Sequence, residues 1–186
     1  MPGVIPKSIT FLTALSVGVC IPMIALSVVN FGMLSIWLNS TVATVILLHH
    51  FAFLITAFVT SKESKPPRLL AEEDESERSI FEEDEAEPST FTHIANVAVV
   101  TFLVILDATA FIIMVDITRL GAIKSTLPAE RIGSHKWNLK IEIGQTCVLG
   151  VELLVLCAIL AICVSGRRRF IAEQKEKMDE MDYGLA

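Results

Sequence analysis

The chain has 186 residues, of which 53% are hydrophobic, and a formal net charge of −6. Its mean hydropathy is +0.61. A soluble domain is usually about 45–50% apolar and lacks apolar runs of about twenty residues, so this composition excludes an ordinary soluble protein. Eleven of the 21 acidic residues lie between Glu63 and Glu87, so the negative charge belongs to one segment. No aqueous segment has the basic character that nucleic-acid binding requires.

The first apolar region is long enough for two membrane spans. No Asp, Glu, Lys or Arg occurs between Lys7 and Lys62, and a transmembrane helix needs about 20 residues. We predict spans at about 9–29 and 37–59, joined by a tight hairpin within 30–40.

An acidic segment, 61–92, follows the first two spans. Its low hydrophobicity and dense charge predict disorder, because such a segment cannot bury a core. Residues 72–79 (EEDESERS) recur imperfectly as residues 82–89 (EEDEAEPS). Two interpretations stay open: a solvated acidic loop, or a docking peptide anchored by Phe81 and flanked by acids. Ser79 precedes an acidic run, which suits an acid-directed kinase, and phosphorylation would add further negative charge.

Two more apolar stretches, at about 94–115 and 143–164, predict the third and fourth spans. Three arginines, Arg167, Arg168 and Arg169, follow the fourth span. They predict either a topology signal alone or a site for anionic headgroups, worth about 1 kcal/mol per cation. The mixed-charge tail at 170–182 is expected to form a short helix that leaves the membrane.

The predicted organisation therefore has four parts: a first hairpin of spans (1–60), the acidic loop (61–92), a second hairpin with a short polar loop (93–166), and a tail (167–186). Four spans put both termini and the acidic loop on one side of the membrane. That side holds ten Lys and Arg residues, and the other side holds five. The excess predicts that both termini are cytosolic. It does not distinguish the plasma membrane from endomembranes.

Ionisable and polar residues interrupt three of the spans: His49, His50, Asp107, Gln145 and Glu152. A charge in hydrocarbon costs several kcal/mol or more, so such groups usually face the bundle interior. At a rise of about 1.5 Å per residue, His49, Asp107 and Glu152 each fall within roughly 4 Å of the midplane. The two histidines point about 100° apart, so only one of them can face a given interior site. Gln145 precedes Glu152 by seven residues and extends the same stripe.

Two carboxyl groups in a low-dielectric interior cannot both stay ionised at low cost, so at least one of Asp107 and Glu152 is expected to carry a proton at neutral pH. If they meet, they titrate as a coupled set. Three interpretations stay open: hydrogen bonds between helices, a proton or ion relay, and contact with the transmembrane helix of a partner. A metal site is not predicted, because adjacent histidines diverge and no His-x-x-His spacing occurs.

Catalytic motifs are absent from the sequence. There is no phosphate-binding glycine loop, no Gly-x-Ser-x-Gly elbow and no zincin motif, so no enzyme activity and no cofactor are predicted. The four cysteines all fall within predicted spans, where they act as small packing residues.

The layout resembles the MARVEL-type tetraspan family, especially its divergent fungal members. The residues that carry the resemblance are Leu106-Asp107-Ala108 in the third span and Gly150-Val151-Glu152-Leu153-Leu154 in the fourth. The resemblance implies four helices, cytosolic termini and a role in membrane apposition and lateral organisation. The acidic loop, about 30 residues long, departs from the compact layout of that family.

These observations predict an all-α, four-helix transmembrane bundle with a disordered acidic loop between helices 2 and 3. The predicted function is that of a non-enzymatic integral membrane organiser or accessory subunit, with the acidic loop as a cytosolic docking segment. Its expected partners are the lipid bilayer, membrane or cytosolic proteins, and further copies of the chain. The alternative is a small proton-coupled transporter or channel that uses Asp107, Glu152 and one histidine.

Overall fold

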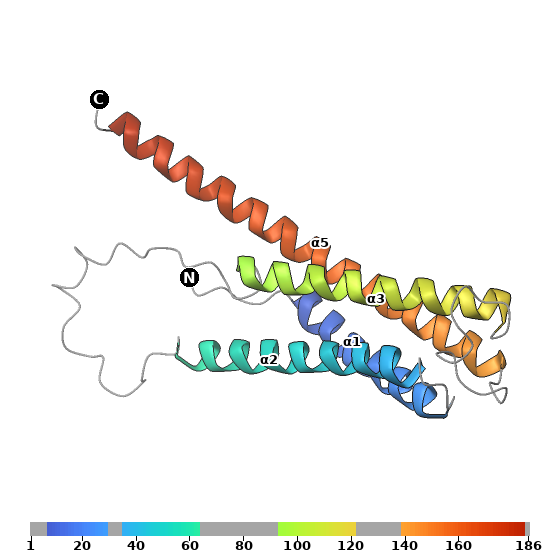
Figure 1. Ribbon diagram of the computed structural model, residues 1–186. Helices are drawn as coiled ribbons and strands as arrows, with labels where there is room; N and C mark the ends of the chain where they lie inside the picture. The colour runs from blue at the N-terminus through green and yellow to red at the C-terminus, as the bar shows by residue number, and fades with distance from the viewer. Residues whose placement is uncertain (1–6, 30–34, 64–92, 122–138, 185–186) are drawn as a thin grey trace.

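The computed structural model describes residues 7–29, 35–63, 93–121 and 139–184. They form α1 (Lys7–Val29), a π-helical turn η1 (Ser35–Ser40), α2 (Thr41–Glu63), α3 (Ile94–Leu120) and α5 (Leu139–Gly184), as Figure 1 shows. These ranges contain no strand, so the predicted all-α class is confirmed. The acidic loop, with Ser79 and Phe81, lies outside the described residues.

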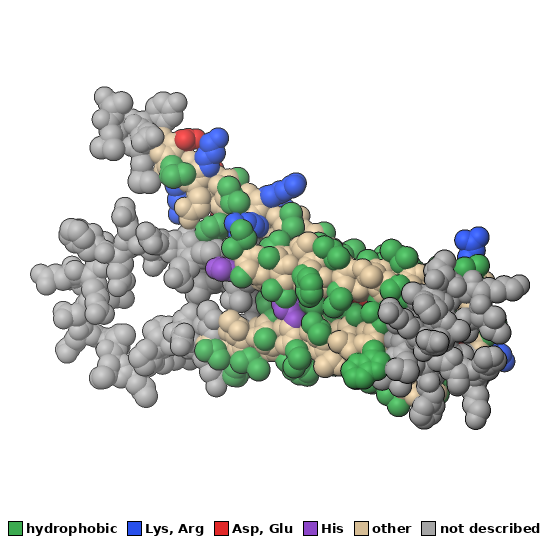
Figure 2. All heavy atoms as spheres, viewed as in Figure 1, with side chains coloured by type: hydrophobic (Ala, Val, Ile, Leu, Met, Phe, Trp, Pro, Cys, Tyr) green, Lys and Arg blue, Asp and Glu red, His purple; other side chains and the backbone are tan. Residues whose placement is uncertain are grey.

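Among the described residues, four helices are long and apolar enough to cross a membrane: Lys7–Val29, Trp37–Thr56, Ile94–Leu120 and Leu139–Asp179. Their outer faces expose large apolar side chains, including Phe11, Phe102 and Leu154. On the face in Figure 2, apolar side chains cover the middle of the bundle, while Lys and Arg gather at one end and along the projecting part of α5. Lipid solvates such a surface, so the predicted four-span membrane protein is confirmed.

The helices are antiparallel to their chain neighbours, and α5 packs against both α1 and α3. On α1, Ser16 and Ser27 bond to Glu152 and Gln145 of α5, so the two helices run in opposite directions. On α3, Asn96 bonds to Cys163 and Thr118 bonds to Thr146, which gives the same antiparallel register. The first half of α1 and of α3 therefore lies at the same depth in the bundle as the second half of the membrane-spanning part of α5.

Buried positions repeat with a mean spacing of 3.5 residues. On α1 they are Ile9, Thr13, Ser16, Cys20, Met23 and Ser27; on α3 they are Val100, Leu103, Asp107, Ala110, Met114 and Ile117. This spacing is typical of left-handed bundles. Many of the buried residues are small or polar. Lipid solvates apolar side chains as well as a protein core does, so transmembrane helices associate through the close packing of small residues and through hydrogen bonds between helices.

The ends of α3 have local causes. His93 caps its start, since its Nδ1 accepts a hydrogen bond from the Ala95 N–H at 3.3 Å. Gly121 ends it with φ of +75°, a conformation that favours glycine, and its N–H donates to the Ile117 carbonyl at 2.8 Å. The helix therefore runs five residues past the predicted end at residue 115. The polar residues Asp116, Thr118 and Arg119 near its end are part of the helix.

Two other sequence predictions need correction. Part of the predicted hairpin at 30–40 is helical, because Ser35–Ser40 forms η1. The span at 143–164 and the tail helix at 170–182 are one helix, α5, of 46 residues. No proline lies between them, and Gly166 alone costs only about 1 kcal/mol.

The length of α5 is about 69 Å at 1.5 Å per residue, more than twice the hydrocarbon thickness of about 30 Å. Figure 1 shows its last turns extending beyond the other three helices, toward the C-terminus. Residues 167–184, called here the α5 arm, make up this projecting part. The arm leaves the end of the bundle where α1 begins, called here the termini end.

Candidate functional site

Each of the four helices places one polar side chain at the same depth in the bundle: Ser16 on α1, His50 on α2, Asp107 on α3 and Glu152 on α5. Ser16, Asp107 and Glu152 are 0% exposed, and His50 is 2% exposed. These four residues are called here the polar layer. By helical rise, Glu152 lies about 18 Å from Lys140 and about 22 Å from Arg167, which places the layer near the middle of the span.

Ser16 is the centre of the hydrogen bonding. Its Oγ lies 2.7 Å from His50 Nε2 and donates to Glu152 Oε1. A serine hydroxyl has one hydrogen to donate and can also accept a hydrogen bond. The hydrogen bonds among His50, Ser16 and Glu152 can therefore be satisfied in two arrangements. In one, His50 Nε2–H donates to Ser16 and Ser16 donates to the Glu152 carboxylate. In the other, protonated Glu152 donates to Ser16, and Ser16 donates to an unprotonated Nε2.

Asp107 is buried beside these hydrogen-bonded residues. Within the part of the molecule that the structure describes, both of its carboxyl oxygens and Oε2 of Glu152 have no hydrogen-bond partner. The two acids lie on α3 and α5, which pack against each other. The described parts of the spans carry no Lys or Arg at this depth. Two buried carboxyl groups, one of them linked through Ser16 to an imidazole, are a set of groups suited to binding protons.

The two adjacent histidines have different surroundings. His50 is buried in the polar layer, whereas His49 is only half-buried, and their ring centroids lie 5.5 Å apart. The sequence left open which of them faces the interior site. The structure places His50 in contact with Ser16 and leaves His49 at the edge of a neighbouring cavity.

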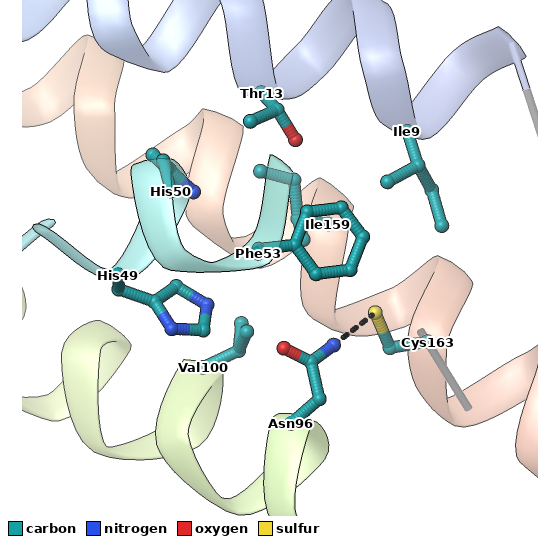
Figure 3. Close-up of a pocket in the computed structure, with 9 residues that line it drawn as sticks. All are labelled: Ile9, Thr13, His49, His50, Phe53, Asn96, Val100, Ile159 and Cys163. Carbon is teal, nitrogen blue, oxygen red and sulfur yellow. Dashed lines mark hydrogen bonds between the residues drawn. The ribbon is translucent and has the colours of Figure 1, made fainter. Parts of the chain in front are cut away.

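That cavity lies between all four helices, as Figure 3 shows. Its lining includes Thr13 of α1, His49 and His50 of α2, Asn96 of α3 and Cys163 of α5. The space open to the centre of a water-sized sphere is about 10 Å³, close to what one water molecule requires. Asn96 Nδ2 lies 3.8 Å from Cys163 Sγ across the cavity. We call this cavity the His49 cavity.

Gln145 is buried but lies away from the polar layer. Its Nε2 lies 3.4 Å from Ser27 Oγ, and Ser27 donates to the Met23 carbonyl at 2.7 Å. Seven residues separate Gln145 from Glu152, a rise of about 10 Å. Met23, Ile46 and Leu149, each at most 1% exposed, are apolar core residues in this part of the bundle. The structure therefore separates Gln145 from the other predicted intramembrane residues.

Several interior polar residues were missed from the sequence, notably Ser16, Thr13, Ser27 and Asn96. A signal existed, since Ser16 shares a seven-residue spacing with Ile9 and Met23 on the buried face of α1. Asn39 is also 0% exposed, and its amide atoms have no partner among the described residues.

The arginine triplet lies on α5, just outside the central part of the span. Arg168 and Arg169 are exposed and Arg167 is half-buried. At about 22 Å from the polar layer, these side chains lie past the hydrocarbon half-thickness of about 15 Å. This position is outside the hydrocarbon, and the binding of anionic headgroups stays a prediction.

The structure describes no group of three or more His, Cys, Asp or Glu side chains placed to hold a metal ion. All four cysteines are free thiols; Cys20 and Cys163 are buried, and Cys147 and Cys157 are exposed on the outer surface. Comparison with models of protein families, with curated proteins and with solved structures found no match. The MARVEL-type resemblance therefore stays a prediction from the sequence.

Proposed function

We propose that the protein is a non-enzymatic membrane organiser or accessory subunit that binds partner proteins at its cytosolic face. The observation that supports this proposal is the continuity of α5. One helix runs from the polar layer, through the arginine triplet, into the exposed α5 arm. A partner that bound the arm would therefore be fixed rigidly to the transmembrane bundle.

The surface of the α5 arm suits recognition by another helix. Ile171 and Met178 are 53% and 56% exposed and lie seven residues apart, on one helical face. Charged residues of both signs surround them: Glu173, Lys175, Glu176, Lys177 and Asp179. Helix-in-groove binding uses apolar anchors at i, i+3, i+4 and i+7, and Ile171 and Met178 occupy the first and last of these positions. The MARVEL-type resemblance implies a similar role in lateral organisation.

The acidic loop leaves the bundle at the same end as the arm, because α2 ends and α3 begins at the termini end (Figure 1). The excess of Lys and Arg on this side supports a cytosolic location. We therefore propose that the loop, with Phe81 and the phosphorylation candidate Ser79, and the arm form one cytosolic docking region. The arginine triplet would hold anionic headgroups beside it.

Breaking the arm is the test of this proposal. Ala172 is exposed, so Ala172→Pro should interrupt the helix at a cost of about 3 kcal/mol while leaving the bundle intact. We expect this variant, and separately a deletion of residues 72–87, to lose proteins that co-purify with the full chain from detergent-solubilised membranes. Membrane insertion should be unchanged.

Ala172→Ser is the matched control, because it keeps the helix and adds only one hydroxyl group. It should retain the wild-type set of co-purifying proteins. If Ala172→Pro and the 72–87 deletion both retain that set at wild-type levels, the docking proposal is wrong.

A second candidate, a small proton-coupled transporter or channel, is favoured by the hydrogen-bonded chain His50–Ser16–Glu152. In reconstituted vesicles that contain a pH-sensitive dye, this function predicts a proton flux that both Glu152→Gln and Asp107→Asn abolish. Equal leakage from the wild type and the two variants would exclude it. Transport would also require the apolar core residues on the side of the polar layer away from the termini end to move apart, since Met23, Ile46 and Leu149 are buried there.

A further inference from the structure

We propose that the polar layer binds a proton and exchanges it with the termini end of the bundle through the His49 cavity, and not with the opposite end. This inference does not depend on a docking or a transport function. A one-sided site of this kind takes up and releases protons without carrying them across the membrane.

The first support is the state of the acids. Asp107 is 0% exposed and neither of its oxygens has a hydrogen-bond partner among the described residues. The titratable groups near Glu152 are Cys20 from α1, His50 from α2, with His49 beside it, and Asp107 from α3. No cationic Lys or Arg in the described spans shares this depth. The dry pair of carboxyl groups is therefore relieved most simply by binding a proton.

The second support is a connection between the acids and the cavity. His50 belongs to both, because its Nε2 bonds Ser16 and its side chain lines the His49 cavity (Figure 3). When a proton enters from the termini end, a hydronium ion in the cavity protonates Nδ1 of His50 and is left as a neutral water. The Nε2 proton passes to Ser16 Oγ, and the original hydroxyl proton of Ser16 passes to Glu152 Oε1. One proton has then moved from the hydronium ion to Glu152, and His50 is left neutral as its Nδ1–H tautomer.

The third support is the position of the cavity along the bundle. Thr13 precedes Ser16 on α1, Phe53 follows His50 on α2, and Asn96 precedes Asp107 on α3. Cys163 follows Glu152 on α5. Because of the antiparallel register, all these residues lie on the termini side of the polar layer. Asn96, Thr13 and the two histidines supply the polar partners that a water needs.

The opposite side is closed by apolar packing. Met23, Ile46, Met114 and Leu149 are at most 1% exposed and belong to one hydrophobic cluster. The next polar pair along the interior is Ser27 and Gln145, about 10 Å from Glu152 by helical rise. Buried apolar side chains of this cluster lie between Glu152 and that pair.

Infrared difference spectroscopy of the full chain in lipid vesicles tests the proposal. Vesicles captured by a C-terminal tag have the tail outward, and those not captured have it inward. A change of external pH should alter the carbonyl band of protonated carboxylic acid in tail-outward vesicles and leave it unaltered in tail-inward ones. Glu152→Gln or Asp107→Asn should lose part of this band.

Ser16 provides a second readout that needs no acidic variant. Ser16→Ala should slow the response of the carboxylic acid band to a pH jump by roughly tenfold or more, since a positioned proton-transfer group is lost. Ser16→Thr keeps the hydroxyl and should restore the rate. An absent carboxylic acid band, an equal response from both sides, or an unchanged rate in Ser16→Ala would each overturn the proposal.

Discussion

Replacing Asp107 with leucine is expected to stabilise the bundle, by about 1–3 kcal/mol, although Asp107 is a fully buried core residue. Leucine has the same branching as aspartate, and the substitution removes two carboxyl oxygens that have no hydrogen-bond partner among the described residues. The free energy of unfolding is measured in detergent micelles, by titration with a denaturing detergent while helical circular dichroism is recorded.

The matched substitution of the other acid should have the opposite sign. Glu152→Met keeps the length of the side chain but removes the acceptor of the Ser16 hydroxyl. It should lower the free energy of unfolding by about 0.6–2 kcal/mol, the usual range for a hydrogen bond between transmembrane helices. If Asp107→Leu destabilises the protein as much as Glu152→Met does, Asp107 has partners that the polar layer as described here does not include.

A stabilising Asp107→Leu would mean that the protein retains an acid at a cost in stability. Residues of this kind in membrane spans are usually functional. The same variant should then lose part of the carboxylic acid band in the infrared experiment. Gain of stability together with loss of proton binding is the trade-off expected of a functional site.

The fold followed from the sequence because hydropathy alone defines a span. The sequence therefore predicts the four apolar stretches and the end of the first at residue 29, but not the ends of α3 and α5. The predicted third span ends at residue 115, before the charged residues Asp116 and Arg119, but a charged side chain does not end a helix; the φ of Gly121 does. The α5 arm was split from its span for a similar reason. The arginine triplet marks the membrane surface, and the helix continues through it.

The candidate site was partly predictable. Helical rise placed Asp107 and Glu152 at one depth, but it could not choose between His49 and His50, because that choice depends on which face of α2 turns inward. Ser16 was missed because hydroxyl side chains in spans usually bond to their own helix. Thr101 and Thr109 do so, each donating to the carbonyl four residues earlier. Only the packing of three helices shows that Ser16 bonds across them.

A larger side chain at Gly150 is expected to disrupt the packing of α3 on α5. A Cβ at this position would lie 3.1 Å from Cε2 of Phe111, closer than ordinary contact, so the Phe111 ring would have to move. Gly150→Leu adds three further carbons and should lower the free energy of unfolding by about 1–3 kcal/mol, the usual cost of overpacking. The same detergent titration measures the change.

Gly18→Leu is the control, because a Cβ at Gly18 would meet no atom within 4 Å and the residue lies on the exposed face of α1. Both variants gain the same helix preference of leucine over glycine, which is somewhat less than the roughly 0.8–1 kcal/mol between glycine and alanine. The difference between them therefore isolates the contact with Phe111. Gly18→Leu should leave the bundle as stable as the wild type or slightly more stable. Equal stabilities of the two variants would show that Gly150 does not lie against α3, and the register that aligns Asp107 with Glu152 would be wrong as well.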